Sequence, residues 1–398
     1  MSDTRGLLRV RQEGGPAASE VKSVELFFDL VFVFAITQIS HALLAHLDLV
    51  GVLQATLLLI AVWWAWVYTA WATNWLDPDK TAVRLLLFAL MFAGLVMSAS
   101  LPRAFEDRAL TFALAYVCLQ VGRCLFMLWV LKGPRPSNYR NFQRITAWQM
   151  LGGVLWIGGA FLDPTMRLWV WGVAMLVEFM SPAIAFWVPG LGRSSTTDWD
   201  VSGDHMAERC GLFMIIALGE SILVTGATFA TLKWDLSVVA AFISTVVGSI
   251  AMWWIYFHIG AERARHMAGH SADPGRIARL AYTYVHILLV AGVIVSAVAD
   301  ESILKHPHGA SDAKTVAVVV GGPALFLAGN LIFKWITAGW PPLSHVGGCA
   351  MLAGLALAGG AFSPLGLGIG TAIVLVVVAI WEARSLGGFD AGKLEGHA

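Results

Sequence analysis

Long apolar segments, separated by short polar ones, cover almost the whole chain. Twelve of them come close to the roughly 20 residues that a helix needs to cross a bilayer, and Pro, Asp and Gly gather between them, as at Asp77-Pro78-Asp79. This pattern predicts an all-α fold, a polytopic membrane helix bundle with one transmembrane helix per segment. The predicted helices cover residues 26–47, 50–73, 81–101, 109–131, 145–162, 166–189, 207–230, 236–258, 278–299, 315–337, 343–361 and 364–382.

The composition supports this class and excludes several others. Hydrophobic residues make up 58% of the chain and charged residues 13%, whereas a soluble globular protein carries roughly 25% charged residues. The high hydrophobicity also excludes a disordered chain, and a net charge of zero gives no reason to expect a nucleic-acid partner. The four cysteines form no CxxC pair, and the chain has no P-loop, nucleophile elbow or haem signature. We therefore expect no cofactor and no enzymatic activity.

The positive charges orient the predicted helices. With the N-terminus in the cytoplasm, the cytoplasmic segments carry nineteen Lys and Arg residues and the outer loops six, which is the asymmetry of the positive-inside rule. Residues 1–24 are hydrophilic and are not a signal peptide, since the apolar stretch after them is too long for one. Both termini are therefore expected in the cytoplasm.

The two halves of the chain resemble each other. The segment 93–99 (AGLVMSA) corresponds to 291–297 (AGVIVSA), and 158–161 (GGAF) corresponds to 359–362 (GGAF), in the same order in both halves. This predicts a duplication into two parallel six-helix repeats, as in some transporters, with a functional pathway between the halves. The predicted parts are a cytoplasmic segment 1–24, a first repeat 25–190, a linker 191–206, a second repeat 207–384 and a cytoplasmic tail 385–398.

A few polar residues interrupt the predicted helices. A charged side chain at mid-membrane costs roughly 2.5–3.5 kcal/mol on insertion scales, so such residues are candidates for function. Glu220 lies near the middle of its segment, and the repeat places Gln38 at the matching position; Arg123 is matched in the same way by Asn330. Glu220 and Arg123 could flank a solute, or they could form a purely structural ion pair.

Two further groups carry candidate chemistry. Glu25 and Asp29 are four residues apart and so share one helix face near a helix N-terminus, where they could cap the helix or receive ions. Glu178 is a third acid inside a predicted helix. At the end of the eighth predicted helix, four potential metal ligands recur every fourth residue and so share one helix face: His258, Glu262, His266 and His270. This face is a weak candidate for a metal site.

Three stretches resemble the bacterial low-temperature-requirement protein A family. They are residues 24–37 (VELFFDLVFVFAIT), 71–78 (WATNWLDP) and 207–221 (AERCGLFMIIALGES). The resemblance implies a multi-pass protein of the bacterial inner membrane, linked by name to growth in the cold, and it implies no particular substrate.

The segment 28–37 is also similar, more faintly, to the Phe-Ser-Asp motif of lysosomal potassium channels of the transmembrane-protein-175 type. Phe28 stands where that motif has its Ser, and Leu30 stands in place of a Gly. A cation channel with a pore lined by helices 1 and 7 is therefore one alternative function.

Our first expectation is a secondary transporter of an ion or small solute, and a membrane enzyme or non-transporting scaffold is a further alternative. The expected partners are the lipid bilayer, the solute and a second copy of the chain.

Overall fold

The computed structural model describes residues 4–9, 21–194, 203–258 and 279–394. Within these ranges it has twelve α-helices, and β pairing is limited to two isolated bridges, which confirms the all-α class. The α-helices are α1 (Ser23–Ala45), α2 (Leu49–Trp75), α3 (Thr81–Ser100), α4 (Ala109–Leu131), α5 (Pro136–Ala160), α6 (Pro164–Met180), α7 (Gly203–Thr231), α8 (Leu236–Phe257), α11 (His286–Lys305), α12 (Ala313–Ala338), α13 (Leu343–Leu357) and α14 (Pro364–Leu394). Shorter turns are the 3-10 helices η1 (Thr4–Leu7), η3 (Leu101–Arg103) and η6 (Gly359–Ala361) and the π-helical turn η5 (Arg279–Val285).

Each predicted membrane segment overlaps one of these α-helices. In the described part of the chain, nine helical segments are long and apolar enough to cross a membrane. The other three helices are α5, α6 and α13, and α13 has only 15 residues. The structure thus agrees with a polytopic helical membrane protein.

Helix α5 begins nine residues before the predicted segment because its first turns are polar yet buried. Arg144 donates to the Asn141 side chain at 2.8 Å and, through Nη2, to the Leu191 carbonyl at 2.6 Å. Asn138 is also buried. A prediction from hydropathy places such residues outside the helix, because it does not include their hydrogen-bond partners.

Three other helix ends differ clearly from the prediction, and one of them is the end of α11, which lies at Lys305 instead of 299. Helix α6 ends at Met180 instead of continuing to 189. Pro182 follows at once, and Ala185 and Phe186 adopt positive φ angles of 54° and 47°, which an α-helix does not allow. Helix α14 continues to Leu394, so the first part of the predicted tail 385–398 is helical.

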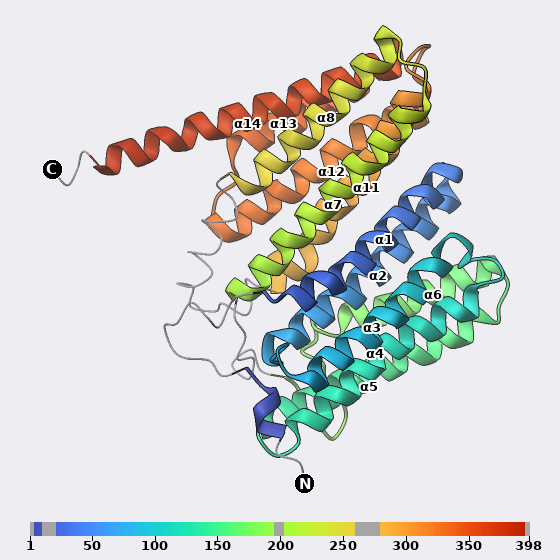
Figure 1. Ribbon diagram of the computed structural model, residues 1–398, viewed down its shortest axis with the longest axis vertical. Helices are drawn as coiled ribbons and strands as arrows, with labels where there is room; N and C mark the ends of the chain where they lie inside the picture. Colours follow the sequence, from blue (N-terminus) through green and yellow to red (C-terminus); the bar gives the residue numbers. More distant parts are fainter. Residues whose placement is uncertain (1–3, 10–20, 195–202, 259–278, 395–398) are drawn as a thin grey trace. The chain divides into compact units, whose positions relative to one another are not determined.

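The helices form two compact units, unit 1 (Met1–Arg209) and unit 2 (Cys210–Ala398). In unit 1, α3 packs against α1 and α4, and α5 packs against α4 and α6 (Figure 1). In unit 2, α11 packs against α12, α8 packs against α14, and α13 lies against α12 and α14. The predicted duplication, with its boundaries, stays a prediction.

Helices α11 and α12 of unit 2 are close enough for their backbones to touch. A Cβ atom added at Gly292 would lie 2.6 Å from the Phe326 nitrogen, and one at Gly322 would lie 2.6 Å from the Ser296 nitrogen. Both distances are shorter than a real carbon contact allows. Glycine at these two positions therefore makes this close packing possible, as small residues do between membrane helices.

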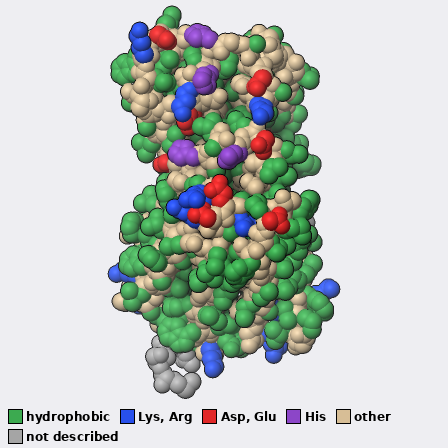
Figure 2. Space-filling view, turned by 90° about the vertical axis from the view of Figure 1, so that its right-hand side faces the viewer, with side chains coloured by type: hydrophobic (Ala, Val, Ile, Leu, Met, Phe, Trp, Pro, Cys, Tyr) green, Lys and Arg blue, Asp and Glu red, His purple; other side chains and the backbone are tan. Residues whose placement is uncertain are grey.

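Many large apolar side chains lie on the surface. Leu49, Phe92, Val154 and Trp169 each expose more than two thirds of their surface. Hydrophobic side chains are spread widely over the face drawn in Figure 2. A soluble protein rarely exposes large apolar patches, whereas lipid covers them without cost.

Candidate functional site

A cluster of charged residues is buried in unit 1 around the first turns of α1. Glu25 and Asp29 lie on one face of this helix, and Arg209, in the second turn of α7, contacts both of them. Arg209 Nη1 lies 3.0 Å from Glu25 Oε1, and Nη2 lies 2.5 Å from Asp29 Oδ1. All three side chains are fully buried.

Two more residues hold Glu25 from the other side. Arg9 Nη2 lies 2.9 Å from Glu25 Oε2, and His205 Nε2 lies 3.0 Å from Glu25 Oε1. Arg9 reaches this position because the chain after η1 pairs with the end of α2 through a bridge between Leu8 and Leu76. The carboxylate also accepts the backbone N–H of Lys22 at 3.0 Å, which caps α1. Glu25 therefore has charged or polar donors on both oxygens.

Helix α2 completes the cluster with uncharged groups. Trp66 donates its indole N–H to Asp29 Oδ1 at 2.7 Å, and Thr73 Oγ1 accepts from Arg209 Nη1 at 3.2 Å. The Arg209 guanidinium also lies 5.7 Å from the centre of the Trp66 ring, within cation–π range. The side-chain amide of Asn74 lies 3.5 Å from His205 Nδ1. We call the set Arg9, Glu25, Asp29, Trp66, Thr73, Asn74, His205 and Arg209 the α1 charge cluster.

The charges of this cluster sum to zero, but two of its buried polar atoms have no hydrogen-bond partner among the described residues. Two guanidinium groups face two carboxylates, so the ionised side chains sum to zero when His205 is neutral. Among the described residues, however, Asp29 Oδ2 and Arg209 Nε have no hydrogen-bond partner although both atoms are buried. A buried acceptor without a partner costs roughly 1–3 kcal/mol. A proton bound at Asp29 Oδ2 would neutralise the carboxylate without displacing Trp66 or Arg209 from Oδ1.

Glu178 is the centre of a second buried network in unit 1. Tyr116 donates to its Oε2 at 2.6 Å and Trp156 to its Oε1 at 2.8 Å, and Gln120 contacts Oε2 at 3.4 Å. Arg123 binds the other end of Gln120, with 2.6 Å between Nη2 and Oε1. The three side chains that contact Glu178 come from α4 and α5, and their polar groups satisfy its carboxylate.

Arg123 has its partners inside unit 1. Besides Gln120, it donates to Thr69 Oγ1 at 3.1 Å and to the Ala65 carbonyl at 3.3 Å. Glu220 is half-buried and belongs to unit 2. A pairing of Arg123 with Glu220 would join the two units and stays a prediction.

Gln38 and Asn330, the two polar residues predicted to match Glu220 and Arg123, belong to different units. Gln38 is half-buried in α1, more than three turns after Glu25. Asn330 is buried in α12, where its amide donates to the Phe326 carbonyl at 3.2 Å. Its Oδ1 has no hydrogen-bond partner among the described residues.

The predicted metal-binding face is largely outside the described residues, because Glu262, His266 and His270 lie in the gap 259–278. His258 is exposed and stacks on Trp254, with 4.5 Å between the ring centres. The residues that are described contain no group of three potential metal ligands.

A cavity of about 280 Å³ lies at the other end of α1. Apolar side chains make up most of its wall, and four polar ones contribute to it: His46, Asp48, Gln54 and Glu106. This combination, a mostly apolar cavity with a few polar groups, is typical of sites for small molecules.

The sequence indicated the acids of the α1 charge cluster but not their partners. From the sequence, Arg209 is one of the positive charges of a cytoplasmic segment, and Arg9 is part of the hydrophilic segment 1–24. One signal was available: Arg209 lies inside the stretch 207–221, and Glu25 and Asp29 lie inside 24–37, the two longest stretches of the family resemblance. Two acids on one buried helix face require a cation, and Arg209 is the only Arg or Lys in the second stretch.

Comparison with known proteins identifies the family. The family model described as bacterial low temperature requirement A protein (LtrA) matches residues 20–380. The chain belongs to the LtrA family. Within unit 1, the matched range includes every member of the α1 charge cluster except Arg9.

One relative extends this match to nearly the whole chain. It is an uncharacterized protein of Rhizobium meliloti (strain 1021), 40% identical over 368 residues, which cover 91% of this chain and 88% of the relative. The LtrA assignment itself rests on the family match over residues 20–380 and not on a short motif. The similarity to the potassium channels stays a prediction.

Proposed function

We propose that this LtrA protein is a secondary transporter of an ion or small solute, driven by protons that bind at Asp29. The observation that carries the proposal is the buried Asp29 carboxylate, which binds Arg209 and Trp66 through Oδ1 and has no partner at Oδ2 among the residues that the structure describes. Ionisable groups inside membrane helices are costly, and they commonly mark proton relays and solute pathways.

Protonation of Asp29 would change the balance of the α1 charge cluster. The neutral acid attracts Arg209 much less than the carboxylate does, and the cluster then carries one excess positive charge. Glu25 keeps its contacts with Arg9, His205 and Lys22 and continues to anchor the start of α1. A proton at Asp29 therefore shifts the free energy of one specific contact between α1 and the start of α7, which is what a coupling step requires.

The 280 Å³ cavity is the part of unit 1 suited to a solute. It shares α1 with the charge cluster, and its acids Asp48 and Glu106 favour a cationic or hydrogen-bonding solute over an anion. We further propose that the protein works without catalytic activity in the bacterial inner membrane, with both termini in the cytoplasm and a second copy of the chain as partner.

The test is transport in liposomes that contain the purified full-length protein. A pH-sensitive dye inside the vesicles reports proton movement while small cationic and neutral solutes are added outside. We expect slow, saturable proton movement that depends on one class of solute. Asp29→Asn should reduce it at least tenfold, and Asp79→Asn, which changes an exposed acid in the same unit, should leave it intact.

The alternatives give different results. A large current that does not saturate and needs no solute would indicate a cation channel instead. Absence of any flux in the unmodified protein would contradict transport and favour an enzyme or a scaffold. Loss of coupling in Glu220→Gln, with retention in Asp29→Asn, would assign the proton site to Glu220.

A further inference from the structure

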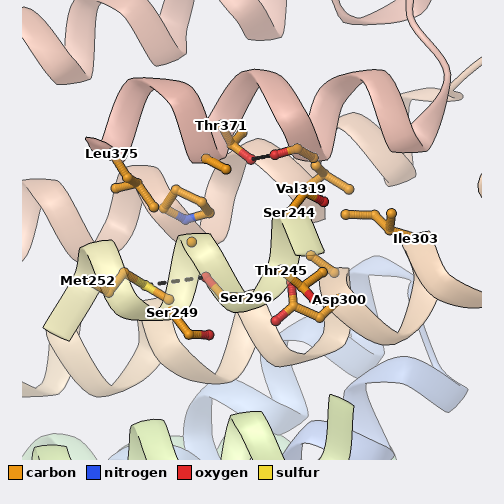
Figure 3. Close-up of a pocket in the computed structure, with 15 residues that line it drawn as sticks. Ser244, Thr245, Ser249, Met252, Ser296, Asp300, Ile303, Val319, Thr371 and Leu375 are labelled. Carbon is orange, nitrogen blue, oxygen red and sulfur yellow. Dashed lines mark hydrogen bonds between the residues drawn. The ribbon is translucent and has the colours of Figure 1, made fainter. Parts of the chain in front are cut away.

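Unit 2 contains a small polar cavity beside Asp300. It has a volume of about 30 Å³, and side chains from α8, α11, α12 and α14 line it. One molecule of water needs roughly 10–15 Å³ of such space, so the cavity accepts an ion with one water molecule but no larger solute. Its polar lining consists of Asp300 and the hydroxyl groups shown in Figure 3: Ser244, Thr245, Ser249, Ser296 and Thr371.

Asp300 is the only charged residue in this lining. It is 8% exposed, and within the described ranges no hydrogen bond or ion pair compensates its carboxylate. It lies five residues before the end of α11, which corresponds to about 7.5 Å of helix. An isolated carboxylate at this depth is very unfavourable unless it binds a proton or another cation.

Three of these five hydroxyl groups are oriented to accept and not to donate within the cavity, and a fourth, Ser296, directs its proton to Met252 Sδ at 3.9 Å. Ser244, Thr245 and Thr371 each donate their proton to a backbone carbonyl of their own helix, at 2.8, 2.9 and 2.9 Å. Each proton is therefore used, and the oxygen lone pairs remain for a ligand in the cavity. A wall of acceptor oxygens suits a cation and disfavours an anion or a donor-rich solute.

The backbone of α12 supplies a further oxygen. Pro323 lies inside this helix and has no N–H, so the Val319 carbonyl lacks its usual hydrogen bond from four residues later. Val319 and Pro323 both line the cavity. Broken helices offer backbone carbonyls to sodium ions in transporters by the same principle.

We infer that Asp300 and these oxygens form a binding site for one monovalent cation of the size of sodium. The single negative charge is neutralised by one monovalent ion, whereas a divalent ion would leave an excess positive charge inside the membrane. The hard oxygen ligands are those that such ions prefer. This site is in unit 2 and concerns binding alone, so it does not rest on proton-driven transport through unit 1.

The experiment measures thermal unfolding of the purified full-length protein in detergent. Sodium chloride replaces choline chloride at constant ionic strength, and tryptophan fluorescence reports the midpoint Tm. We expect sodium to raise Tm in a saturable way, by roughly 4 °C or more at saturation. Lithium should act similarly, and potassium should act more weakly because the cavity is small.

Three variants test the assignment. Asp300→Asn should abolish the sodium effect, and without sodium it should be at least as stable as the unmodified protein, because the buried charge is gone. Glu301→Gln is the matched control, since this neighbouring acid pairs with Lys305 instead of the cavity; it should keep the full effect. Thr245→Val keeps the side-chain shape and should weaken the apparent sodium affinity roughly tenfold, corresponding to one lost ligand.

Several results would contradict a sodium site at Asp300. An unchanged sodium effect in Asp300→Asn, or the same effect from choline and sodium, would overturn the site. So would a Tm that responds to protons through Asp300 but not to sodium. If Asp300→Asn does not fold, Thr245→Val decides, because an unchanged sodium affinity there would contradict the proposal.

Discussion

The two units bury their acids in different surroundings. In unit 1, Glu25 and Asp29 contact arginines at 3.0 Å or less, and Glu178 accepts from Tyr116 and Trp156. In unit 2, Asp300 faces a cavity lined by hydroxyl groups and has no cationic side chain beside it. Unit 1 thus offsets its buried negative charge with its own residues, whereas unit 2 leaves that task, at Asp300, to an ion from solution.

The largest loss of stability is expected from removing the Arg209 guanidinium, which contacts both acids in unit 1. Arg209→Met leaves Glu25 and Asp29 close together without the cation that contacts both. Breaking a buried ion pair in this way costs about 3–5 kcal/mol, so we expect a strongly lowered Tm or loss of folded protein in detergent. Arg84→Met is the control, because Arg84 pairs with Asp79 on the surface. A normal Tm for Arg209→Met would show that the cluster does not stabilise the fold.

In the described part of unit 2, the buried pair of Lys334 and Glu382 should behave like the ion pairs of unit 1. Lys334 Nζ lies 2.6 Å from Glu382 Oε1, and both side chains are about nine-tenths buried. Lys334→Met leaves Glu382 without its cation and should cost about 3 kcal/mol in unfolding free energy. Adding Glu382→Gln should restore most of the loss. If the single and double variants unfold alike, packing of the lysine stem and not charge is what matters.

A smaller loss of stability should follow from adding a methyl group beside the Glu178 carboxylate. A Cβ atom at Gly152 would lie 2.6 Å from Glu178 Oε1. Gly152→Ala should therefore displace the carboxylate from Trp156 and lower stability by about 1–3 kcal/mol, as overpacking does. Gly122→Ala on α4 has nothing within 4 Å of the added atom and should not destabilise. Equal Tm values for the two variants would mean that Glu178 tolerates displacement.

The smallest expected change in stability concerns Asp312, which caps α12 just outside the membrane-spanning segment. Hydrogen bonds with the Thr315 side chain and backbone hold the pKa of Asp312 below its ordinary value of 3.8. A lowered pKa in the folded state stabilises the protein above about pH 4 and loses this contribution as the pH falls through the folded value. The Tm difference between the unmodified protein and Asp312→Asn should thus shrink on acidification. A difference that is constant with pH would contradict the cap.

The sequence predicts the helices well because lipid imposes a length and a composition on each of them. It predicts the start of α5 poorly, because Asn141 and Arg144 are buried there through hydrogen bonds to each other and to a distant carbonyl. The end of α6 was predicted too late because the apolar residues after Met180 continue in a loop.

The candidate sites were predicted only in part, for one physical reason. Glu25 and Asp29 stand out by themselves as charges in an apolar helix, but Arg209 becomes meaningful only once the start of α7 lies against α1. Asp300 was not singled out, because the apolar segment was taken to end at residue 299, just before it. The hydroxyl groups that give Asp300 its role come from α8 and α14 as well as from α11 itself, and no local pattern connects them.

The glycine contacts between α11 and α12 have a mechanical consequence. Two helices whose backbones touch at Gly292 and Gly322 cannot slide past each other without a collision. We therefore expect Asp300 and Pro323 to keep a nearly constant distance, and we expect any motion around the cavity to involve α8 and α14. Amide hydrogens of α11 and α12 should accordingly exchange with solvent deuterium more slowly than those of α8 and α14.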